Sequence, residues 1–154
     1  MRILIQRVRC AAVRVDGETV GEIGPGLLLF VGLGGEDSAS AFPKIIEKVT
    51  KLRIFPDDED RFDRSVEDIG GGILTVSQFT LYGDLRRGRR PSFSAAMPPA
   101  QARALYAEWV GALRLAYTAG PVADGQFAAM MDVDLVNDGP VTLWLDTREF
   151  NPSE

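Results

Sequence analysis

An uncharged polar cluster ends the most apolar stretch in the middle of the chain. Ser77, Gln78, Phe79 and Thr80 close a buried strand that we expect over residues 73–81. Alternation along a strand that long places Gln78 and Thr80 on one face and Ser77 and Phe79 on the other. These side chains could orient a ligand or a water molecule by hydrogen bonding. The alternative is a strand that simply runs out into a solvated loop.

The composition limits what this cluster can do. The chain of 154 residues has no histidine, and Cys10 is its one cysteine. Serine–histidine and cysteine–histidine catalysis, histidine-ligated zinc, cysteine metal cages and intrachain disulfides are therefore excluded, and we expect neither a metal nor a cofactor. A nucleophilic Thr80 would have no obvious general base, so an orienting role fits it better.

A second candidate lies near the end of the chain, where Asn137, Asp138, Gly139 and Pro140 stand in sequence. On its own this pattern is typical of a tight turn between two strands. X-Pro bonds are also the only peptide bonds with appreciable cis content, and glycine restricts the preceding backbone little. A cis bond here could turn carbonyl groups in an unusual direction.

Charge is unevenly distributed. The net charge is −5, but residues 57–68 hold seven acids and two arginines, so the rest of the chain is neutral. Residues 84–90 have the opposite bias, with four arginines (Arg86, Arg87, Arg89 and Arg90) and one acid. This segment is either a solvated loop or a contact for nucleic-acid phosphates.

Two other patterns give only weak evidence of function. Asp132 and Asp134 share one face of an expected strand and could be a carboxylate pair, but a solvated strand face explains them equally well. Residues 32–35 are glycine-rich and precede a helix, yet they lack a Walker or dinucleotide pattern.

The elements that must position these residues can be read from the hydrophobic pattern. Strands are expected through the first 33 residues, with a hairpin turn at Asp16-Gly17 and a strand covered on both faces at 27–31. An apolar stripe over residues 42–52 predicts a helix with Ser40 as its N-cap. A second helix opens at Pro98-Pro99 and stops near Gly120-Pro121.

Two last strands are expected at about 127–136 and 141–147, separated by the Asn137–Pro140 turn, whereas the acidic stretch and the arginine-rich segment are expected to be loops. The hairpin signals favour mostly antiparallel pairing. The fold class is therefore α/β, with residues 1–154 forming a single domain of strands and two main helices.

No apolar run is long enough to span a bilayer, and the first residues do not resemble a signal peptide because Gln6 and Arg7 interrupt them. We expect a cytoplasmic protein without a membrane partner, in which Cys10 stays reduced.

Several motifs together resemble one family, the D-aminoacyl-tRNA deacylases, first known as D-tyrosyl-tRNA deacylases. The matching segments, in the family's order and spacing, are Ile5–Val8, Gly21–Gly24, Ser77–Leu81, Arg90–Ser94 and Leu135–Thr142. They extend over nearly the whole chain.

The resemblance implies a homodimer with β/β/α layers that hydrolyses the ester between a D-amino acid, or glycine, and the 3′-terminal adenosine of tRNA. It implies that Gly139 and Pro140, in the cis form, enter the partner's site as a chiral gate that rejects L-amino acids, and that Arg7 supports this gate. Ser77, Gln78, Phe79 and Thr80 would line the site. Phe127, Ala128, Ala129 and Met131 would lie near the adenosine, and Arg86, Arg87, Arg89 and Arg90 would be free to meet tRNA phosphates.

The sequence departs from the family pattern at Met130, where a polar residue is expected, and at residues 82–84. An aminoacyl ester is already activated and its ribose 2′-hydroxyl can assist its hydrolysis, so a site without histidine or metal can suffice. Three alternatives remain open: an RNA-binding module without activity, a structural homodimer, and a hydrolase of other esters or amides. No DNA partner is expected.

Overall fold

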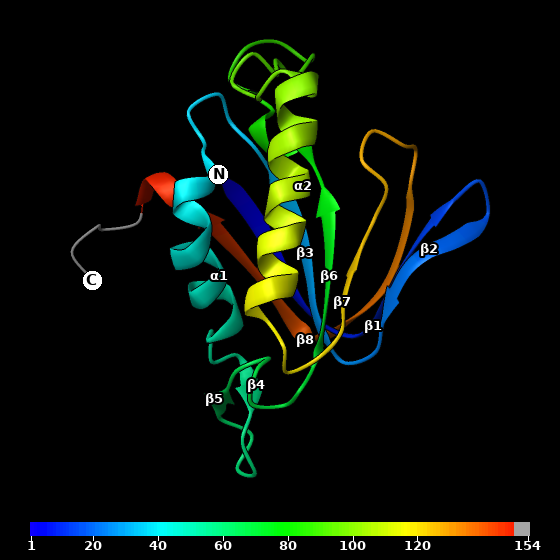
Figure 1. Cartoon of the computed structure of the whole chain (residues 1–154), viewed down its shortest axis with the longest axis vertical. Coiled ribbons are helices and arrows are strands. Elements are labelled where there is room, and N and C mark those ends of the chain that lie inside the picture. Colours follow the sequence, from blue (N-terminus) through cyan, green and yellow to red (C-terminus); the bar gives the residue numbers. More distant parts are fainter. Residues whose placement is uncertain (150–154) are drawn as a thin grey trace.

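The computed structural model describes residues 1–149 (Figure 1). Its strands and helices, in chain order, are β1 (Arg2–Val15), β2 (Glu18–Ile23), β3 (Gly26–Gly32), α1 (Phe42–Thr50), β4 (Phe55–Pro56), β5 (Phe62–Arg64), β6 (Gly72–Ser77), α2 (Pro99–Ala116), β7 (Val122–Asp124) and β8 (Asp132–Asp146). Short 3-10 turns cover Ala39–Ala41, Phe79–Tyr82 and Thr147–Glu149.

Strand β1 organises the main sheet because it pairs antiparallel with β2, β3 and β8. The expected hairpin turn between β1 and β2 is confirmed: Asp16 and Gly17 both have positive φ, 51° and 82°. β8 follows β1 along its whole length and has no other partner strand within residues 1–149, so its outer edge is open.

The other half of the sheet is parallel. β3 pairs with β6, and β6 pairs with β7, in the parallel sense. The expectation of mostly antiparallel pairing thus holds for the ladders of β1, but the parallel part was not predicted. The crossover connections explain it, because α1 and α2 each return the chain across the sheet before the next strand.

Two hydrophobic clusters lie on opposite faces of the central strands. Leu27 and Leu29 point to the helices, where Phe42 and Trp109 pack edge to face with ring centroids 5.4 Å apart. Leu28 points to the other side, into a cluster built from the second half of β1 and the first residues of β8 together with β2 and β6. This gives the expected β/β/α layers, and it explains why the run at 27–31 is apolar throughout.

The second β layer is closed by a tight approach between β2 and β7. A Cβ atom added to Gly21 would lie 2.5 Å from the backbone oxygen of Asp124, closer than real contacts allow. Only glycine therefore fits where the curled sheet brings these strands together.

The helices form where the apolar stripes predict, with different ends. α1 buries Phe42, Ile45, Ile46 and Val49 as expected, but its N-cap is Ala41, not Ser40, which lies in the preceding 3-10 turn. α2 ends at Ala116, before the expected stop near Gly120.

Buried Thr75 helps to attach α2 to the sheet. Its hydroxyl on β6 accepts hydrogen bonds from Trp109 Nε1 at 3.1 Å and from the Tyr106 hydroxyl at 3.4 Å.

Two strand predictions and one loop prediction differ from the structure. β6 ends at Ser77 and continues as a 3-10 turn, so the strand expected over 73–81 is shorter. Residues 127–131 are irregular, and the two last strands are one strand, β8, with the Asn137–Pro140 segment inside it. The acidic stretch expected to be a loop contains the small β4–β5 hairpin.

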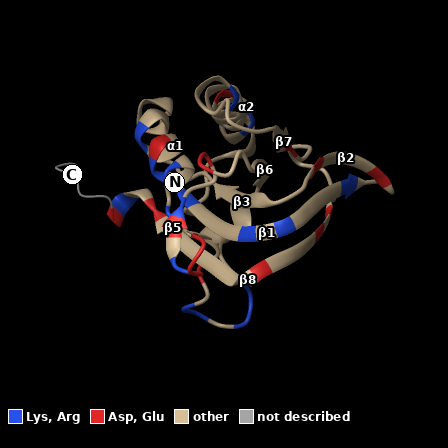
Figure 2. Cartoon of the chain, turned by 90° about the horizontal axis from the view of Figure 1, so that it is seen from below, with Lys and Arg blue, Asp and Glu red and all other residues tan. Residues whose placement is uncertain are grey.

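Acidic residues gather beside β5 (Figure 2). Four of the seven acids in residues 57–68 form ion pairs with three nearby arginines, as in the pairs Arg61–Asp57, Arg64–Asp58 and Arg53–Asp63, so the stretch stays strongly acidic. Within the described part of the chain, no helix is long and apolar enough to cross a membrane.

Candidate functional site

Three parallel strands end at one edge of the sheet. Val31 of β3 is level with Ser77 of β6, and Thr75 of β6 is level with Asp124 of β7. The segments that follow β6 and β7 therefore leave the sheet at the same edge. Ligands of open α/β sheets bind at such carboxyl ends. The fold thus brings together two of the expected groups, Ser77–Thr80 and Phe127–Met131.

The polar cluster after β6 is a turn and not the end of a strand. Gln78 donates its backbone N–H to Val31 at 2.8 Å, and its side-chain amide donates to the Thr80 hydroxyl. Ser77 and Gln78 are half-buried, whereas Phe79 and Thr80 are exposed. The expected strand is wrong here, because β6 ends at Ser77 and a 3-10 turn follows. Gln78 and Thr80 nevertheless lie together, as expected, and touch through their side chains.

This turn offers hydrogen-bond donors but no base. Its own i to i+3 bonds begin with Leu81 N–H donating to the Gln78 carbonyl at 3.3 Å, so the N–H groups of Phe79 and Thr80 precede the turn's internal bonds. Within residues 1–149, the partner of the Thr80 hydroxyl is the Gln78 amide, which cannot accept its proton. The geometry suits the stabilisation of a negative oxygen by backbone amides.

Aromatic and cationic contacts hold the turn in place. Phe79 packs edge to face on Phe93, with centroids 5.0 Å apart. Arg2 donates to the Leu81 carbonyl at 2.8 Å, and its guanidinium lies 4.4 Å from the ring centroid of Tyr82 and 5.7 Å from that of Trp144. Arg2 was not predicted from the sequence, because nothing in the pattern around an arginine at the start of a strand indicates which distant residues its side chain will contact.

The segment after β7 is a compact turn. Phe127 packs on Tyr106 of α2, with centroids 5.8 Å apart. Ala128 has a φ of 63°, and Ala129 donates its N–H to the Gln126 carbonyl at 3.2 Å. Met131 packs against the second hydrophobic cluster.

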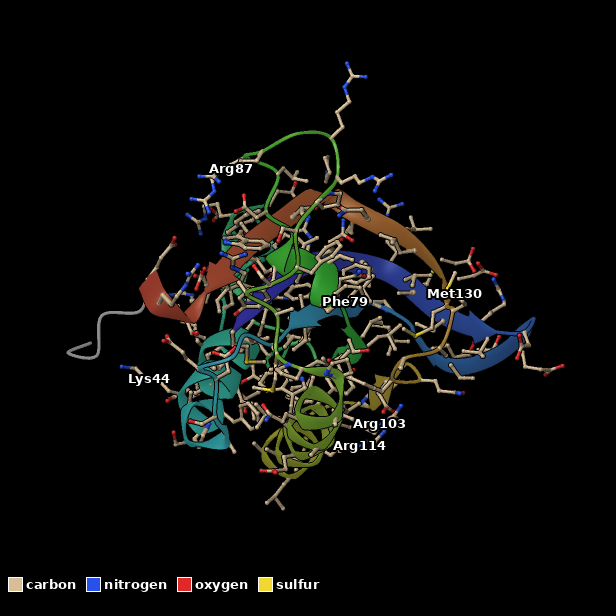
Figure 3. All side chains as sticks on the ribbon, turned by 90° about the horizontal axis from the view of Figure 1, so that it is seen from above. Lys44, Phe79, Arg87, Arg103, Arg114 and Met130 are labelled. Atoms are coloured by element: carbon tan, nitrogen blue, oxygen red, sulfur yellow. The ribbon has the colours of Figure 1, made fainter. Side chains whose placement is uncertain are left out.

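Its neighbour Met130, the residue that departs from the family pattern, is 92% exposed (Figure 3).

The arginine-rich segment leaves the same end of the molecule as a loop, as expected. Asp84 and Ser92 pinch its base through two backbone hydrogen bonds, of 2.7 and 3.0 Å. Arg86 is tied to the Asp84 carboxylate, and its hydrogen bonds lower the pKa of that carboxyl to about 2. Arg87, Arg89 and Arg90 are exposed and form no ion pair within the described residues, with Arg87 projecting from the loop (Figure 3).

Residues 138–141, which include Gly139 and Pro140, leave the ladder between β1 and β8 and form an excursion within β8. Gln6 pairs with Thr142 and Val8 with Asn137, so Arg7 alone stands opposite residues 138–141. The Gly139–Pro140 peptide bond is cis, and both residues are exposed.

Asn137 closes the base of this excursion. Its side chain accepts from the Val141 N–H at 2.8 Å and donates to the Val141 carbonyl at 3.2 Å.

Arg7 lies under this excursion, where the resemblance implies a supporting role. Its side chain is 8% exposed, and Nε donates to the Asp138 carbonyl at 2.8 Å and lies 3.4 Å from the Asp138 carboxylate. It also donates to the Ile54 carbonyl and lies 5.4 Å from the ring centroid of Phe62. The acidic hairpin and the excursion therefore share one buried cation.

The two halves of the expected site, the turn after β6 and the Gly139–Pro140 excursion, do not meet within one chain. The turn after β6 lies level with Arg2 at the start of β1, whereas the excursion lies opposite Arg7. Five residues along a strand correspond to roughly 17 Å. The excursion therefore lies beside the middle of β1, away from the turn after β6, which lies at the start of β1.

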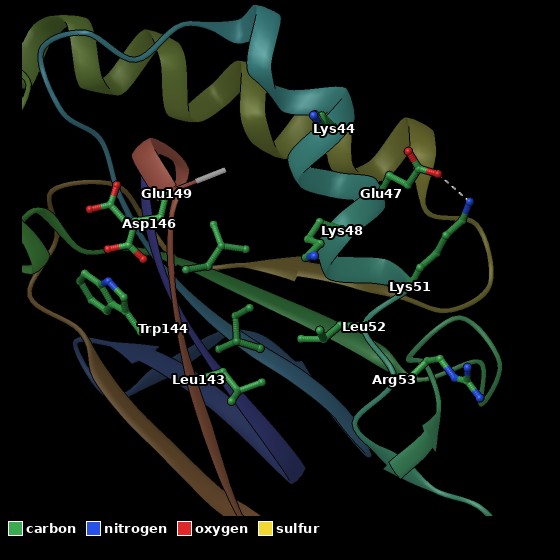
Figure 4. A pocket seen from close by; sticks show the side chains of 12 residues that line it. Lys44, Glu47, Lys48, Lys51, Leu52, Arg53, Leu143, Trp144, Asp146 and Glu149 are labelled. Atoms are coloured by element: carbon green, nitrogen blue, oxygen red, sulfur yellow. Dashed lines mark hydrogen bonds and ion pairs between the residues drawn. The ribbon is translucent and has the colours of Figure 1, made fainter. Parts of the chain in front are cut away.

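A groove between α1 and β8 contains none of the expected residues (Figure 4). Leu143 and Trp144 line one side, and Lys51, paired with Glu47 at 2.8 Å, lines the other. Two of its lining residues, Trp144 and Asp146, contact Arg2, which also donates to the Leu81 carbonyl of the turn after β6.

Comparison with known proteins identifies close relatives. A family model described as D-Tyr-tRNA(Tyr) deacylase matches residues 4–146. A protein of Syntrophobacter fumaroxidans named D-aminoacyl-tRNA deacylase is 52% identical over 97% of this chain and 99% of that protein.

Two solved structures share the fold of this chain. One named c-Myc DNA Unwinding Element Binding Protein is 38% identical, with a TM-score of 0.89 over 96% of this chain and 99% of that one. Another, described as "Structural Analysis of a probable eukaryotic D-amino acid tRNA deacylase", is 20% identical, with a TM-score of 0.79 over 94% of this chain and 97% of that one, and supports the fold.

The backbone of Gly139 gives a test of the excursion. Gly139 has a φ of 145°, and an added Cβ would lie 2.7 Å from Val141 Cγ2. Gly139→Ala should therefore lower the free energy of unfolding by about 1–3 kcal/mol in urea denaturation. The matched control is Gly24→Ala, because a Cβ there meets nothing within 4 Å. Equal stability of the two variants would contradict this account.

Proposed function

This chain belongs to the D-Tyr-tRNA(Tyr) deacylase family, and we propose that it hydrolyses the ester of D-aminoacyl-tRNA, and of mischarged glycyl-tRNA, to free amino acid and tRNA. The observation that carries the proposal is the turn after β6, where the backbone N–H groups of Phe79 and Thr80, beside Gln78, have no acceptor within residues 1–149.

The chemistry needs little from the protein. Water adds to the ester carbonyl carbon, negative charge develops on the carbonyl oxygen, and the ribose 3′-oxygen leaves with a proton. The N–H groups of Phe79 and Thr80 would stabilise the oxyanion, and the neighbouring ribose 2′-hydroxyl would assist the attack and the departure.

Thr80 would orient and not attack. A nucleophilic hydroxyl needs a base to take its proton, and the group within reach is an amide that donates to it. Gln78 and Thr80 would instead form a fixed pair that positions the ester or the water.

The rest of the tRNA end would lie across the same edge. Phe127, Ala128, Ala129 and Met131 would line the position of the terminal adenosine, because they leave β7 next to the turn after β6. The exposed Arg87, Arg89 and Arg90 would meet phosphates, whereas Arg86 would first have to leave Asp84.

We infer that the chiral gate acts in a homodimer. Gly139 and Pro140 are exposed opposite Arg7, roughly 17 Å along β1 from Arg2 and the Ser77–Thr80 turn that Arg2 contacts, so they would meet such a turn in a second copy. The open edge of β8, with exposed Val136, Leu143 and Trp144, would carry the contact, since long open edges of this kind favour pairing between chains. A rigid backbone at the gate would then exclude L-amino acids by steric conflict.

Aminoacylated tRNA is the proposed substrate and partner, and we expect the activity to lie in the cytoplasm, where such a substrate is found.

The direct assay incubates the purified chain with D-Tyr-tRNA, L-Tyr-tRNA and Gly-tRNA and measures released amino acid. Hydrolysis of the D-tyrosyl and glycyl substrates with the L-tyrosyl substrate spared is the expected result. Release from none of them would overturn the proposal. Equal cleavage of a free D-tyrosine ester would indicate a general esterase instead.

The role of Thr80 is tested by comparing a protein change with a substrate change. Thr80→Ala should keep D-Tyr-tRNA deacylation within about 5-fold of wild type, whereas 3′-aminoacylated tRNA ending in 2′-deoxyadenosine should react roughly 100-fold or more slowly, a typical cost of losing a general catalyst. Thr80→Ser serves as the control. An aminoacyl ester trapped on Thr80 would disprove the orienting role.

The homodimer is tested on the open edge of β8. Val136→Asp should give a monomer in sedimentation and lose most D-Tyr-tRNA deacylation, because a charge on the edge opposes pairing and removes the partner's gate. Val20→Asp is the matched control, since Val20 is a similarly exposed strand valine, 42% against 47% for Val136. A monomeric variant with full activity and L-sparing would sink the proposal of a gate acting between subunits.

A further inference from the structure

Arg103 holds a charge beside the segment that follows β7. It is an exposed residue of α2, and its guanidinium carbon lies 4.9 Å from the ring centroid of Phe127. Phe127 is itself fixed against Tyr106 from the same helix. A ring that is packed from one side gives the cation a defined place, because a guanidinium over an aromatic face is attracted to it.

Arg103 also lacks the neutralising partner that other arginines have. Arg114, on the same helix, pairs with Asp124 at 2.7 Å. Within residues 1–149, Arg103 has no carboxylate partner. Within the described residues none of its N–H groups donates to a protein atom, so these donors, which match the oxygens of a phosphate, remain for a ligand.

The position of this pair relates it to the site. Phe127 lies three residues beyond the end of β7, at the sheet edge where Ser77–Thr80 also leave. Arg103 lies on the side of α2 that faces the segment carrying Met130 (Figure 3). An unpaired cation therefore adjoins the segment to which the proposed function assigns the terminal adenosine.

We propose that Arg103 and Phe127 form a phosphate subsite that takes the phosphate on the 5′ side of the terminal adenosine of tRNA. This rests on the proposed function. The cation, and not the ring, is the binding group, so the subsite selects an anion rather than a stacked base. It would hold the 3′ end in place while the ester lies against the turn after β6.

The test compares three substrates that differ only in what precedes the adenosine: D-Tyr-tRNA, D-tyrosyl adenosine esterified on the ribose 2′ or 3′ oxygen, and the same compound carrying a 5′-phosphate. Arg103→Gln should lower kcat/KM roughly 5- to 20-fold on the tRNA and on the 5′-phosphate compound, mainly through KM, as expected for one charged hydrogen-bonding contact. On D-tyrosyl adenosine the variant should equal wild type.

Controls separate the charge from the fold. Arg103→Lys should restore part of the loss, and Arg114→Gln, on the same helix, should leave all three rates unchanged. An equal loss on all three substrates would overturn the subsite in favour of a structural or base-stacking role. No loss on any substrate would overturn it as well.

A binding measurement keeps this inference separate from the activity. In NMR titrations, adenosine 5′-phosphate should bind wild type more tightly than adenosine does, and Arg103→Gln should abolish the difference. If wild type hydrolyses no D-tyrosyl substrate, the proposed function fails, and the titration alone decides the subsite. If hydrolysis is normal but wild type and Arg103→Gln each bind adenosine and adenosine 5′-phosphate equally tightly, only the subsite fails.

Discussion

The buried guanidinium of Arg7, in the middle of β1, constrains the β8 excursion and the β4–β5 hairpin. Arg7 stands opposite an excursion of β8 and satisfies its charge and its N–H groups with the Asp138 carbonyl, the Asp138 carboxylate and the Ile54 carbonyl. A buried cation left without such partners is strongly destabilising. The excursion, the β4–β5 hairpin and the register on either side of them are therefore fixed together.

β1 also links the excursion beside Arg7 to the turn after β6, where the proposed chemistry takes place. Arg2, five residues earlier in β1, holds the turn after β6 through the Leu81 carbonyl and lies against the rings of Tyr82 and Trp144. β1 thus carries one arginine for each half of the proposed site, with the halves separated along its length. The separation is the physical reason for assigning the gate to a second copy of the chain.

The absence of histidine is compatible with this arrangement. An activated ester requires a place for developing negative charge more than it requires a strong base. The turn after β6 supplies backbone N–H groups, and the loop of residues 84–92 offers three arginines that lack an acidic partner within residues 1–149. The acids that give the chain its net charge lie beside β5, where four of the seven pair with nearby arginines.

The sequence by itself determined which residues are proposed for the site, and it determined most of the elements. The apolar stripe of α1, the hairpin at Asp16-Gly17 and the doubly covered run at 27–31 follow from local periodicity and turn chemistry, which act over a few residues. Tertiary structure decided what depends on distant partners. β6 stops at Ser77 where its ladder with β3 ends, and Asn137–Pro140 is an excursion and not a hairpin because β1 pairs with β8 on both sides of it. The contacts of Arg2 and Arg103 likewise join residues far apart in sequence, and no local pattern encodes them.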